Sequence, residues 1–484
     1  MRILSILALS LLMFAIGHAQ SSQKRLGDFL KAFNSKDDAT IRTMMDANFD
    51  PSIYARRKPE EWSAQLKQFA TDLAPLAIRE ILLDKETAIV AAVLTASGEK
   101  MGLRLDLAKE APHRIVGLRF SGNVQGLVEE RKKVEIRDYK DLSDLARQVR
   151  NGYKVPAIAI AVFQGGKLET AVDGLREVGK SDPVTVNDRW LVGSIGKSMT
   201  STLIGRLIDE GKLDWNSKLG DLLKDVPMLP EYRDVKLEQI MQHRGGMPQD
   251  LNFEGQTVDR IVGRLADPTA IRAAYVKDIL SRKPIAKPGE KFAYSNAGYA
   301  ILGHIAERVT GKPFEILLKE YVFNPIGMDS AIAGLPGTDG QPSGRGEPHG
   351  HIPTADGYEP HVLDGPLNYM GAPAGLGVSC SIGDLAKYVA WHMRGYLGEP
   401  IELKTETVRR LHTQMADKGQ YAAGWVIGDG FQGHNGSDGT FVAEIAFWPK
   451  ERFAAAAIVN CGGAENPSPP MQAILAVYKK LFGK

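Results

Sequence analysis

The chain has 484 residues, of which 60 are Lys or Arg and 58 are Asp or Glu. This near balance excludes a strong net charge as a reason to expect nucleic acid or an anionic membrane as a partner. The length is enough for two or three domains with a sizeable core. Cys380 and Cys461 are the only cysteines; they lack a metal-type spacing, and the sequence leaves open whether they pair or remain buried thiols.

The first residues are typical of a secretory signal peptide. Met1 and Arg2 form a short basic start, residues 3–16 are almost wholly apolar, and small residues precede a cleavage site after Ala19. The apolar run is too short to span a membrane comfortably, which argues against an uncleaved anchor. We therefore expect residues 1–19 to be removed, leaving a periplasmic or secreted protein with no integral membrane span.

Residues 20–123 are predicted to form a small α+β accessory domain. Three stripes of apolar residues at helical spacing come first. Strand-like segments follow at residues 77–83, 88–94, 101–107 and 114–120. Leucines at alternate positions from Leu103 to Leu107 are separated by Arg104 and Asp106, which predicts one buried face and one wet face. Three helices before a strand meander resemble the NTF2-like or cystatin-like folds in architecture alone, without a catalytic cluster.

Residues 124–138 carry mixed charges and are predicted to link this domain to a second one over residues 139–484. The second domain opens with a predicted helix, Leu142 to Val149, and closes with another, Met471 to Phe482. Strand-like segments lie near both of its ends, at residues 155–163, 168–172, 433–436, 441–447 and 453–460. This order predicts an α/β (α+β) fold in which the two ends share one antiparallel sheet flanked by helices. The middle would form a mostly helical lobe, with a site in the cleft between sheet and lobe.

A predicted helix near the middle of the chain carries reactive groups at its start. Apolar residues recur every four positions from Ile195 to Leu207, and Gly211 stands where a helix commonly ends. Ser194 and Lys197 are three residues apart and share one helix face, so the amine can lie beside the hydroxyl. The positive potential of a helix N-terminus disfavours a charged lysine there, and a neutral lysine can take the serine's proton. A surface serine and lysine in a first turn is the alternative, because Ser-x-x-Lys is common by chance.

Two further short motifs carry candidate site residues. Tyr294 and Asn296 are two residues apart in a predicted loop, where a tyrosine can relay a proton and an asparagine can hold a substrate amide. His434 stands two residues before Gly436 in a strand-like segment, where glycine lets a substrate approach the backbone closely. Each motif also has a purely structural interpretation. Tyr294 and Asn296 could be a buried tyrosine and a helix N-cap, and His434 with Gly436 could be an ordinary hairpin edge.

Residues 331–379 are rich in Gly and Pro and show little periodicity, which predicts a functional or mobile loop. They include His349, His351 and His361. A metal site is one interpretation of these histidines, and exposed loop histidines are the favoured one, because no helical spacing of carboxylate and histidine accompanies them.

Taken in order, Ser-x-x-Lys, Tyr-x-Asn and His-x-Gly resemble the motifs of the serine β-lactamase and penicillin-binding protein superfamily. The resemblance is greatest to its class C-type branch, which includes DD-carboxypeptidases, esterases and D-aminopeptidases. Other stretches agree with the same family in the same order, at Val155–Lys167, Ile240–Pro248 and Pro373–Ser379. The resemblance covers about residues 140–484, and it implies a β-lactamase-like transpeptidase fold.

The resemblance also implies a mechanism through an acyl-enzyme, with no metal or organic cofactor. Ser194 would be the nucleophile, and Lys197 and Tyr294 together would act as general base. His434 would orient the tyrosine hydroxyl or the leaving group.

The same resemblance implies a substrate-binding set. Asn296 would hold the acyl side of the substrate, and Gly436 would allow a close approach to the strand. The oxyanion would lie between the backbone N–H groups of Ser194 and Ser437.

The third motif bears on the substrate, which we expect to be a small molecule or peptide, with cell-wall compounds among the options. A histidine supplies no permanent positive charge at neutral pH, whereas β-lactamases of this superfamily typically have a lysine there. The sequence therefore favours an esterase or a DD-peptidase-like enzyme, with a β-lactamase as the alternative. A non-catalytic scaffold that binds the cell wall is the alternative of another class.

Overall fold

A computed structural model describes most of the chain and divides it into two compact units. The first contains Met1–Arg131, and the second contains Lys132–Ile352 and Asp356–Lys484. The described residues are 22–55, 58–96, 98, 100–121, 124–128, 134–248, 267–334, 347–354, 357–361, 377–415, 420–463 and 468–483. The predicted signal peptide therefore lies outside the described residues. No helix in these ranges is long and apolar enough to cross a membrane.

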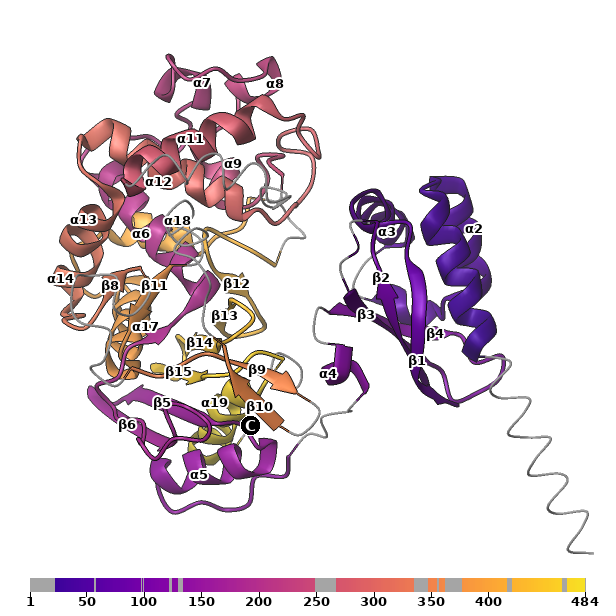
Figure 1. The fold of residues 1–484 in the computed structure, drawn as a ribbon. Coiled ribbons are helices and arrows are strands. Elements are labelled where there is room, and N and C mark those ends of the chain that lie inside the picture. Colours follow the sequence, from indigo (N-terminus) through magenta and orange to yellow (C-terminus); the bar gives the residue numbers. More distant parts are fainter. Residues whose placement is uncertain are drawn as a thin grey trace, which may run out of the picture. The chain divides into compact units, whose positions relative to one another are not determined.

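The first unit packs helices on one face of a four-stranded antiparallel meander (Figure 1). A helix over residues 22–35 is followed by α2 (Asp38–Asn48), a 3-10 turn (Pro51–Ala55) and α3 (Pro59–Leu73). The strands are β1 (Ala77–Lys85), β2 (Ala88–Leu94), β3 (Lys100–Leu107) and β4 (Ile115–Ser121). Each agrees with the predicted segment to within two residues. Alternate strand residues such as Ile89, Val93 and Leu105 pack against Phe29 and Phe33 of the first helix.

The prediction that the polar residues of β3 face water is wrong for Arg104. Arg104 is 1% exposed, donates to Asp106 at 2.6 Å, and also donates to the carbonyl of Leu127 at 2.8 Å. The reason is α4 (Val124–Val128), a short helix that lies over this face. A Cβ atom at Gly102 would stand 2.7 Å from Leu127 Cδ1, so the helix packs directly on the strand. Five residues are too few for a helix to be read from periodicity.

The second unit is built on a six-stranded antiparallel sheet formed by its two ends. The order is β12-β13-β14-β15-β5-β6. The strands are β5 (Ala157–Gln164), β6 (Lys167–Gly174), β12 (Val426–Ile427), β13 (Gln432–Ser437), β14 (Val442–Trp448) and β15 (Phe453–Val459). β15 pairs with β5, with Ala456 opposite Ala161. The prediction that one sheet joins the two ends is confirmed.

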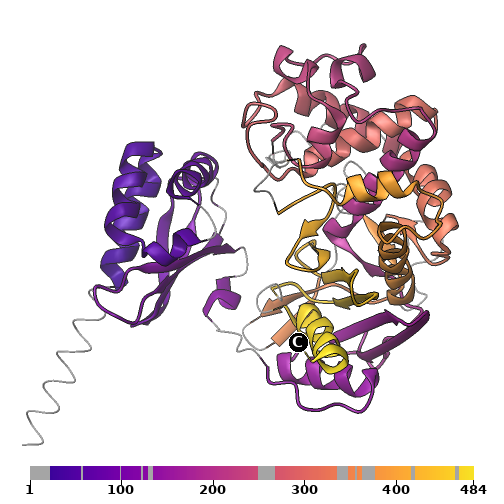
Figure 2. The ribbon, with the colours of Figure 1, turned by 180° about the vertical axis from the view of Figure 1, so that it is seen from behind.

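Helices cover both faces of this sheet, so its central strands are apolar throughout. α5 (Leu142–Tyr153) and α19 (Pro469–Phe482) pack on one face (Figure 2). α17 (Ile382–Tyr396) packs on the other. Along β15, alternate residues belong to the two cores, with Ala456 in one and Ala457 in the other.

The middle of the second unit forms the predicted helical lobe (Figure 1). Its helices are α7 (Leu219–Leu222), α8 (Pro230–Arg233), α9 (Leu237–Met241), α11 (Pro268–Ser281), α12 (Asn296–Thr310), α13 (Phe314–Leu318), a π-helical turn (Lys319–Phe323) and α14 (Asn324–Ile326). Shorter elements complete the unit, namely β7 (Trp190–Leu191), β8 (Ile332–Ala333), β9 (His351–Thr354), β10 (Gly357–Pro360), β11 (Val378–Cys380) and α18 (Thr405–Leu411). Strands β7, β11 and β8 form a small separate sheet.

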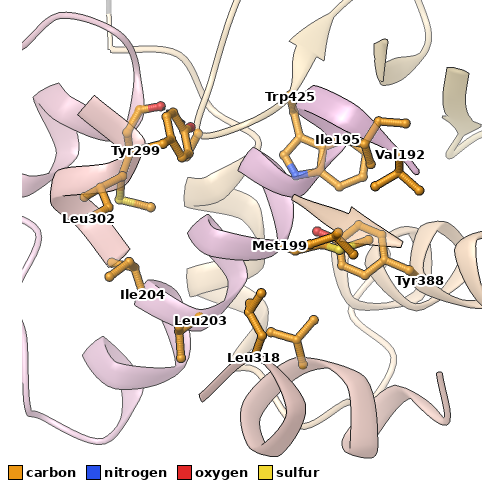
Figure 3. Packing of buried hydrophobic residues seen from close by; sticks show 14 of the residues in the cluster. Val192, Ile195, Met199, Leu203, Ile204, Tyr299, Leu302, Leu318, Tyr388 and Trp425 are labelled. Atoms are coloured by element: carbon orange, nitrogen blue, oxygen red, sulfur yellow. Dashed lines mark hydrogen bonds between the residues drawn. The ribbon is translucent and has the colours of Figure 1, made fainter. Parts of the chain in front are cut away.

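Helix α6 (Gly196–Asp209) lies at the centre of this unit, buried on nearly all sides. Figure 3 shows Met199 of α6 beside Tyr388, with Leu203 of α6 close to Leu318. Most of its residues are fully buried, including polar ones, so neighbouring elements hold the helix from several directions. A residue placed at the start of α6 is therefore held in a fixed position relative to both the sheet and the lobe.

Candidate active site

The serine lies in a tight turn between β7 and α6. Gly193–Ile195 form a 3-10 turn, so Ser194 stands just before the α-helix rather than within its first turn. Gly193 has a φ of +54°, and a Cβ there would stand 2.6 Å from the backbone nitrogen of Ser437. The turn thus requires glycine at this position, because any side chain would push β13 away from Ser194.

The structure brings Ser194, Lys197 and Tyr294 together. Ser194 Oγ accepts from Lys197 Nζ at 3.0 Å and from the Tyr294 hydroxyl at 2.9 Å. Lys197 is completely buried, and its Nζ lies 4.8 Å from the centre of the Tyr294 ring. Helix geometry places Lys197 beside Ser194, as the spacing predicts. Tyr294 is 100 residues further along the chain and is brought to Ser194 by the tertiary fold.

Strand β13 runs past the serine turn at backbone contact distance. A Cβ at Gly436 would stand 2.0 Å from the carbonyl oxygen of Val192 and 3.0 Å from the nitrogen of Ser194. The backbone nitrogens of Ser194 and Ser437 thus belong to two segments that touch each other. Two N–H groups that share one oxyanion must lie close together, and the contact of these two segments meets that requirement.

His434 lies on the same strand, 4% exposed, and contacts a residue that the sequence did not single out. Its Nε2 lies 2.9 Å from the hydroxyl of Tyr421, and its Nδ1 lies against the carbonyl of Asn435. Because a carbonyl only accepts, Nδ1 carries the proton and Nε2 accepts from Tyr421. The sequence indicated Tyr294 for this contact, whereas the hydroxyl that His434 meets is that of Tyr421. Burial, with the nearby Lys197, lowers the pKa of His434 to about 4.

Asn296 is the first residue of α12, two residues beyond Tyr294. The N-cap of this helix is Ser295, whose Oγ accepts from the N–H of Gly298 at 2.9 Å. The capping role that the alternative interpretation gave to Asn296 is therefore performed by its neighbour.

His243 is a second residue that the sequence did not assign to the site, although it lies within the stretch Ile240–Pro248 that resembles a family motif. It is 2% exposed, and its Nδ1 accepts from the N–H of Ser295 at 3.0 Å. Its ring centre lies 4.3 Å from that of Tyr294. Burial, followed by the charge of Lys197, lowers its pKa well below the ordinary value, so the ring is a neutral support behind Tyr294.

The loop histidines do not form a metal centre in the described part of the chain. His351 is fully buried, with Nδ1 donating to the Asn460 carbonyl at 2.7 Å and Nε2 accepting from the Val178 N–H at 3.0 Å. Both of its nitrogens therefore fasten one loop to its neighbours. Among the residues that the structure describes, no three His, Cys, Asp or Glu gather as metal ligands. Cys380 and Cys461 are separate buried thiols.

Comparison with known proteins agrees with this geometry. The family described as Beta-lactamase matches residues 142–478. An unguisins hydrolase of Aspergillus campestris is 26% identical over 68% of this chain and 62% of its own length. Penicillin-binding protein 4 of Amycolatopsis lactamdurans is 28% identical over 38% of this chain and 46% of its own length. The chain thus spans less than two thirds of the length of these relatives.

A solved structure shows the same fold. The octameric penicillin-binding protein homologue from Pyrococcus abyssi superposes with a TM-score of 0.58 and 25% identity, over 71% of this chain and 77% of its own. The chain belongs to the beta-lactamase family, and its second unit has the β-lactamase-like fold that the resemblance implied. In this member of the family, Ser194 lies between an amine and a phenol.

Proposed function

We propose that this protein hydrolyses an ester or amide bond of a small molecule or peptide through an acyl-enzyme on Ser194. One observation carries the proposal: the Ser194 hydroxyl oxygen lies within 3.0 Å of both Lys197 Nζ and the Tyr294 hydroxyl. Either group, once it has lost its own proton, can accept the proton of the serine. The names of the relatives, a hydrolase and a penicillin-binding protein, support acyl transfer as the reaction class.

In the first half of the reaction Ser194 Oγ attacks the substrate carbonyl and gives its proton to the pair of Lys197 and Tyr294. The carbonyl oxygen becomes an oxyanion and accepts from the N–H groups of Ser194 and Ser437. Losing one such donor typically costs about 3 kcal/mol of transition-state stabilisation. The intermediate then collapses, the leaving-group bond breaks, and the Tyr294 hydroxyl returns the proton to the departing oxygen or nitrogen.

In the second half a water molecule takes the place of the leaving group. Tyr294 removes a proton from this water, the resulting hydroxide attacks the acyl carbonyl, and Ser194 leaves with a proton returned by the same pair. The acid product is released, and the free serine is regenerated, so the enzyme returns to its starting state. No metal or organic cofactor takes part in this scheme.

The third motif favours an esterase or DD-peptidase-like activity over that of a β-lactamase. With both of its ring nitrogens in hydrogen bonds and a pKa of about 4, His434 is neutral near pH 7. It offers no positive charge to a substrate carboxylate. Comparing kcat/KM for short-chain esters, D-Ala-D-Ala peptides and nitrocefin ranks the three activities, and a clear preference for nitrocefin would select the β-lactamase alternative.

Covalent labelling tests the proposal directly. The mature protein is incubated with a fluorescent penicillin or a fluorophosphonate, and bound label is measured on a denaturing gel. We expect labelling of the wild type and of Ser201→Ala, a control on the same helix, and none of Ser194→Ala. Equal labelling of Ser194→Ala would overturn the assignment.

The competing scaffold role predicts no turnover at all. Hydrolysis of p-nitrophenyl acetate by the wild type, lost in Lys197→Ala, supports an enzyme. Absence of hydrolysis and of labelling in a folded wild-type protein would leave the cell-wall scaffold as the better account.

We further propose that the protein acts outside the cytoplasm, with the first unit as an accessory or partner-binding domain. The basic start and apolar run of residues 1–19 support export. Sequencing the N-terminus of the mature protein is expected to begin at Gln20, and a retained Met1 would contradict it.

A further inference from the structure

Three aromatic side chains contact one another in series, from Ser194 to a ring that is exposed to solvent. Tyr294 touches Ser194, the Tyr421 ring lies edge-on to Tyr294 with centres 6.4 Å apart, and the Phe292 ring centre lies 5.6 Å from that of Tyr421. Tyr294 and Tyr421 are partly buried, whereas Phe292 is 45% exposed. We call Phe292, Tyr294 and Tyr421 the aromatic wall.

The aromatic wall is held in place from behind by one buried ring. The centre of the His243 ring lies 4.3 Å from that of Tyr294, 4.8 Å from that of Tyr421 and 5.6 Å from that of Phe292. His243 is itself fixed by the N–H of Ser295. The wall is therefore a preformed surface rather than three independent side chains, and ligand binding does not have to order it.

Hydrogen bonds hold the polar ends of the two tyrosines. The Tyr294 hydroxyl is directed to Ser194 and that of Tyr421 to His434. With these ends fixed, ring surface is what the wall offers to a ligand. Phe292 has no polar end and lies two residues before Tyr294 in the chain, so its exposed ring extends the surface outward. Rings of this kind favour apolar and aromatic ligand groups.

A second exposed apolar residue is tied by its backbone to the segment that carries His243. Met415 is 43% exposed, and its N–H donates at 2.7 Å to the side chain of Gln242, the neighbour of His243. Single exposed apolar residues are ordinary on protein surfaces. A hydrogen bond thus ties the backbone of Met415 to the residue that precedes His243.

We propose that the aromatic wall is the subsite for an apolar, ring-containing leaving group of the substrate, and that Phe292 sets this preference. The inference rests on the proposed function and extends it to a substrate class. Tyr294 gives its proton to the leaving atom, so the leaving group passes beside Tyr294. The surface that continues from Tyr294 through Tyr421 to Phe292 then lies along that group.

The test compares two acetate esters, ethyl acetate and benzyl acetate, followed by acid release in a pH-stat. Both give the same acetyl-enzyme, so a difference between them arises before or during acylation. For Phe292→Ala we expect kcat/KM for benzyl acetate to fall about two- to tenfold, the range of a lost aromatic contact. Ethyl acetate should change less than twofold, and Phe292→Leu should lie between the wild type and Phe292→Ala.

Matched controls separate the subsite from general damage. Ile316→Ala removes an apolar side chain that is also 45% exposed, on α13, and should change neither ester. Fluorophosphonate labelling of Ser194 in Phe292→Ala checks that the variant still reacts at its serine. Absence of labelling in the wild type would instead contradict the proposed function and would not bear on the subsite. Equal loss for both esters with normal labelling would overturn the subsite. A loss seen for ethyl phenylacetate and not for benzyl acetate would overturn its assignment to the leaving group.

Discussion

Each unit of this protein buries a basic side chain completely, and the two are surrounded differently. Arg104 in the first unit lies against the carboxylate of Asp106 and the carbonyl of Leu127. Lys197 in the second unit lies against the hydroxyl of Ser194 and the face of the Tyr294 ring. A guanidinium stays charged, and its contacts neutralise that charge and fix it. A hydroxyl can exchange a proton with an amine, so the contacts of Lys197 suit chemistry and those of Arg104 suit stability.

Removing the amine of Lys197 should have a greater effect than any other change considered below. Lys197→Ala should lower kcat/KM for p-nitrophenyl acetate by about three orders of magnitude or more, because the serine loses the group that shares its proton. Stopped-flow or steady-state assays measure this loss, with circular dichroism as the check on folding. A folded Lys197→Ala protein that keeps most of its activity would show that this lysine is structural.

The corresponding change in the first unit should affect stability alone. Arg104→Met removes the hydrogen bonds to Asp106 and to the Leu127 carbonyl, while Asp106 keeps its ion pair with Arg119. The change should destabilise that unit by roughly 1–2 kcal/mol. Hydrogen exchange of the β2–β4 amides measures this locally. Esterase activity should not change, and a matching loss of activity would contradict the separation of roles.

The contact between β13 and the serine turn predicts the next effect. Gly436→Ala places a methyl group where the Val192 carbonyl stands, so the strand and the Ser194 turn must move apart. Misplacing one oxyanion donor should cost about 10²–10³ in kcat. Gly383→Ala, on α17 of the same unit, is the control, because a Cβ there would meet only ordinary contacts at 3.7 Å or more. Similar activities of the two variants would argue against an oxyanion site there.

A smaller effect follows from the buried histidines of the second unit. Burial lowers the pKa of His434 to about 4 and that of His412 to about 3. The unfolded chain binds these protons near pH 6.5, whereas the folded chain does so only near the lowered values. These two histidines therefore contribute a loss of stability as the pH drops from about 6.5 toward 4, against the opposite contribution of Glu444, whose pKa burial raises to about 8. Thermal denaturation at several pH values measures this slope, which should be shallower in His412→Gln; an identical slope would show that other groups carry it.

Much of the fold follows from period and order in the sequence. Most strands of the four-stranded and six-stranded sheets read as alternating or apolar runs, and the meeting of β15 with β5 follows from strands at both ends of one domain. β12 (Val426–Ile427) has only two residues and was not predicted. The alternation in β3 predicts a wet face for Arg104, because the helix that covers this residue has only five residues and leaves no periodic signal. A charged residue at an alternating position looks the same in sequence whether a helix or water lies over it.

The candidate site could be predicted in part for a similar reason. Ser194 and Lys197 are linked by helix geometry, and Tyr294 by an ordered motif. His243 and Tyr421 enter through ring contacts and one hydrogen bond between segments far apart in the chain. Contacts between distant segments follow no fixed residue spacing in the sequence. The packing of His243 and Tyr421 around Tyr294 can therefore be seen only in the folded structure.

Mass spectrometry of the trapped acyl-enzyme tests the central claim most directly. The wild type and Lys197→Ala are mixed with a slowly hydrolysed ester, quenched in acid, digested and mapped. We expect one acyl group per wild-type chain, located on Ser194, and acylation slowed by about three orders of magnitude or more in Lys197→Ala. An adduct on another residue, or acylation at the wild-type rate in Lys197→Ala, would contradict it.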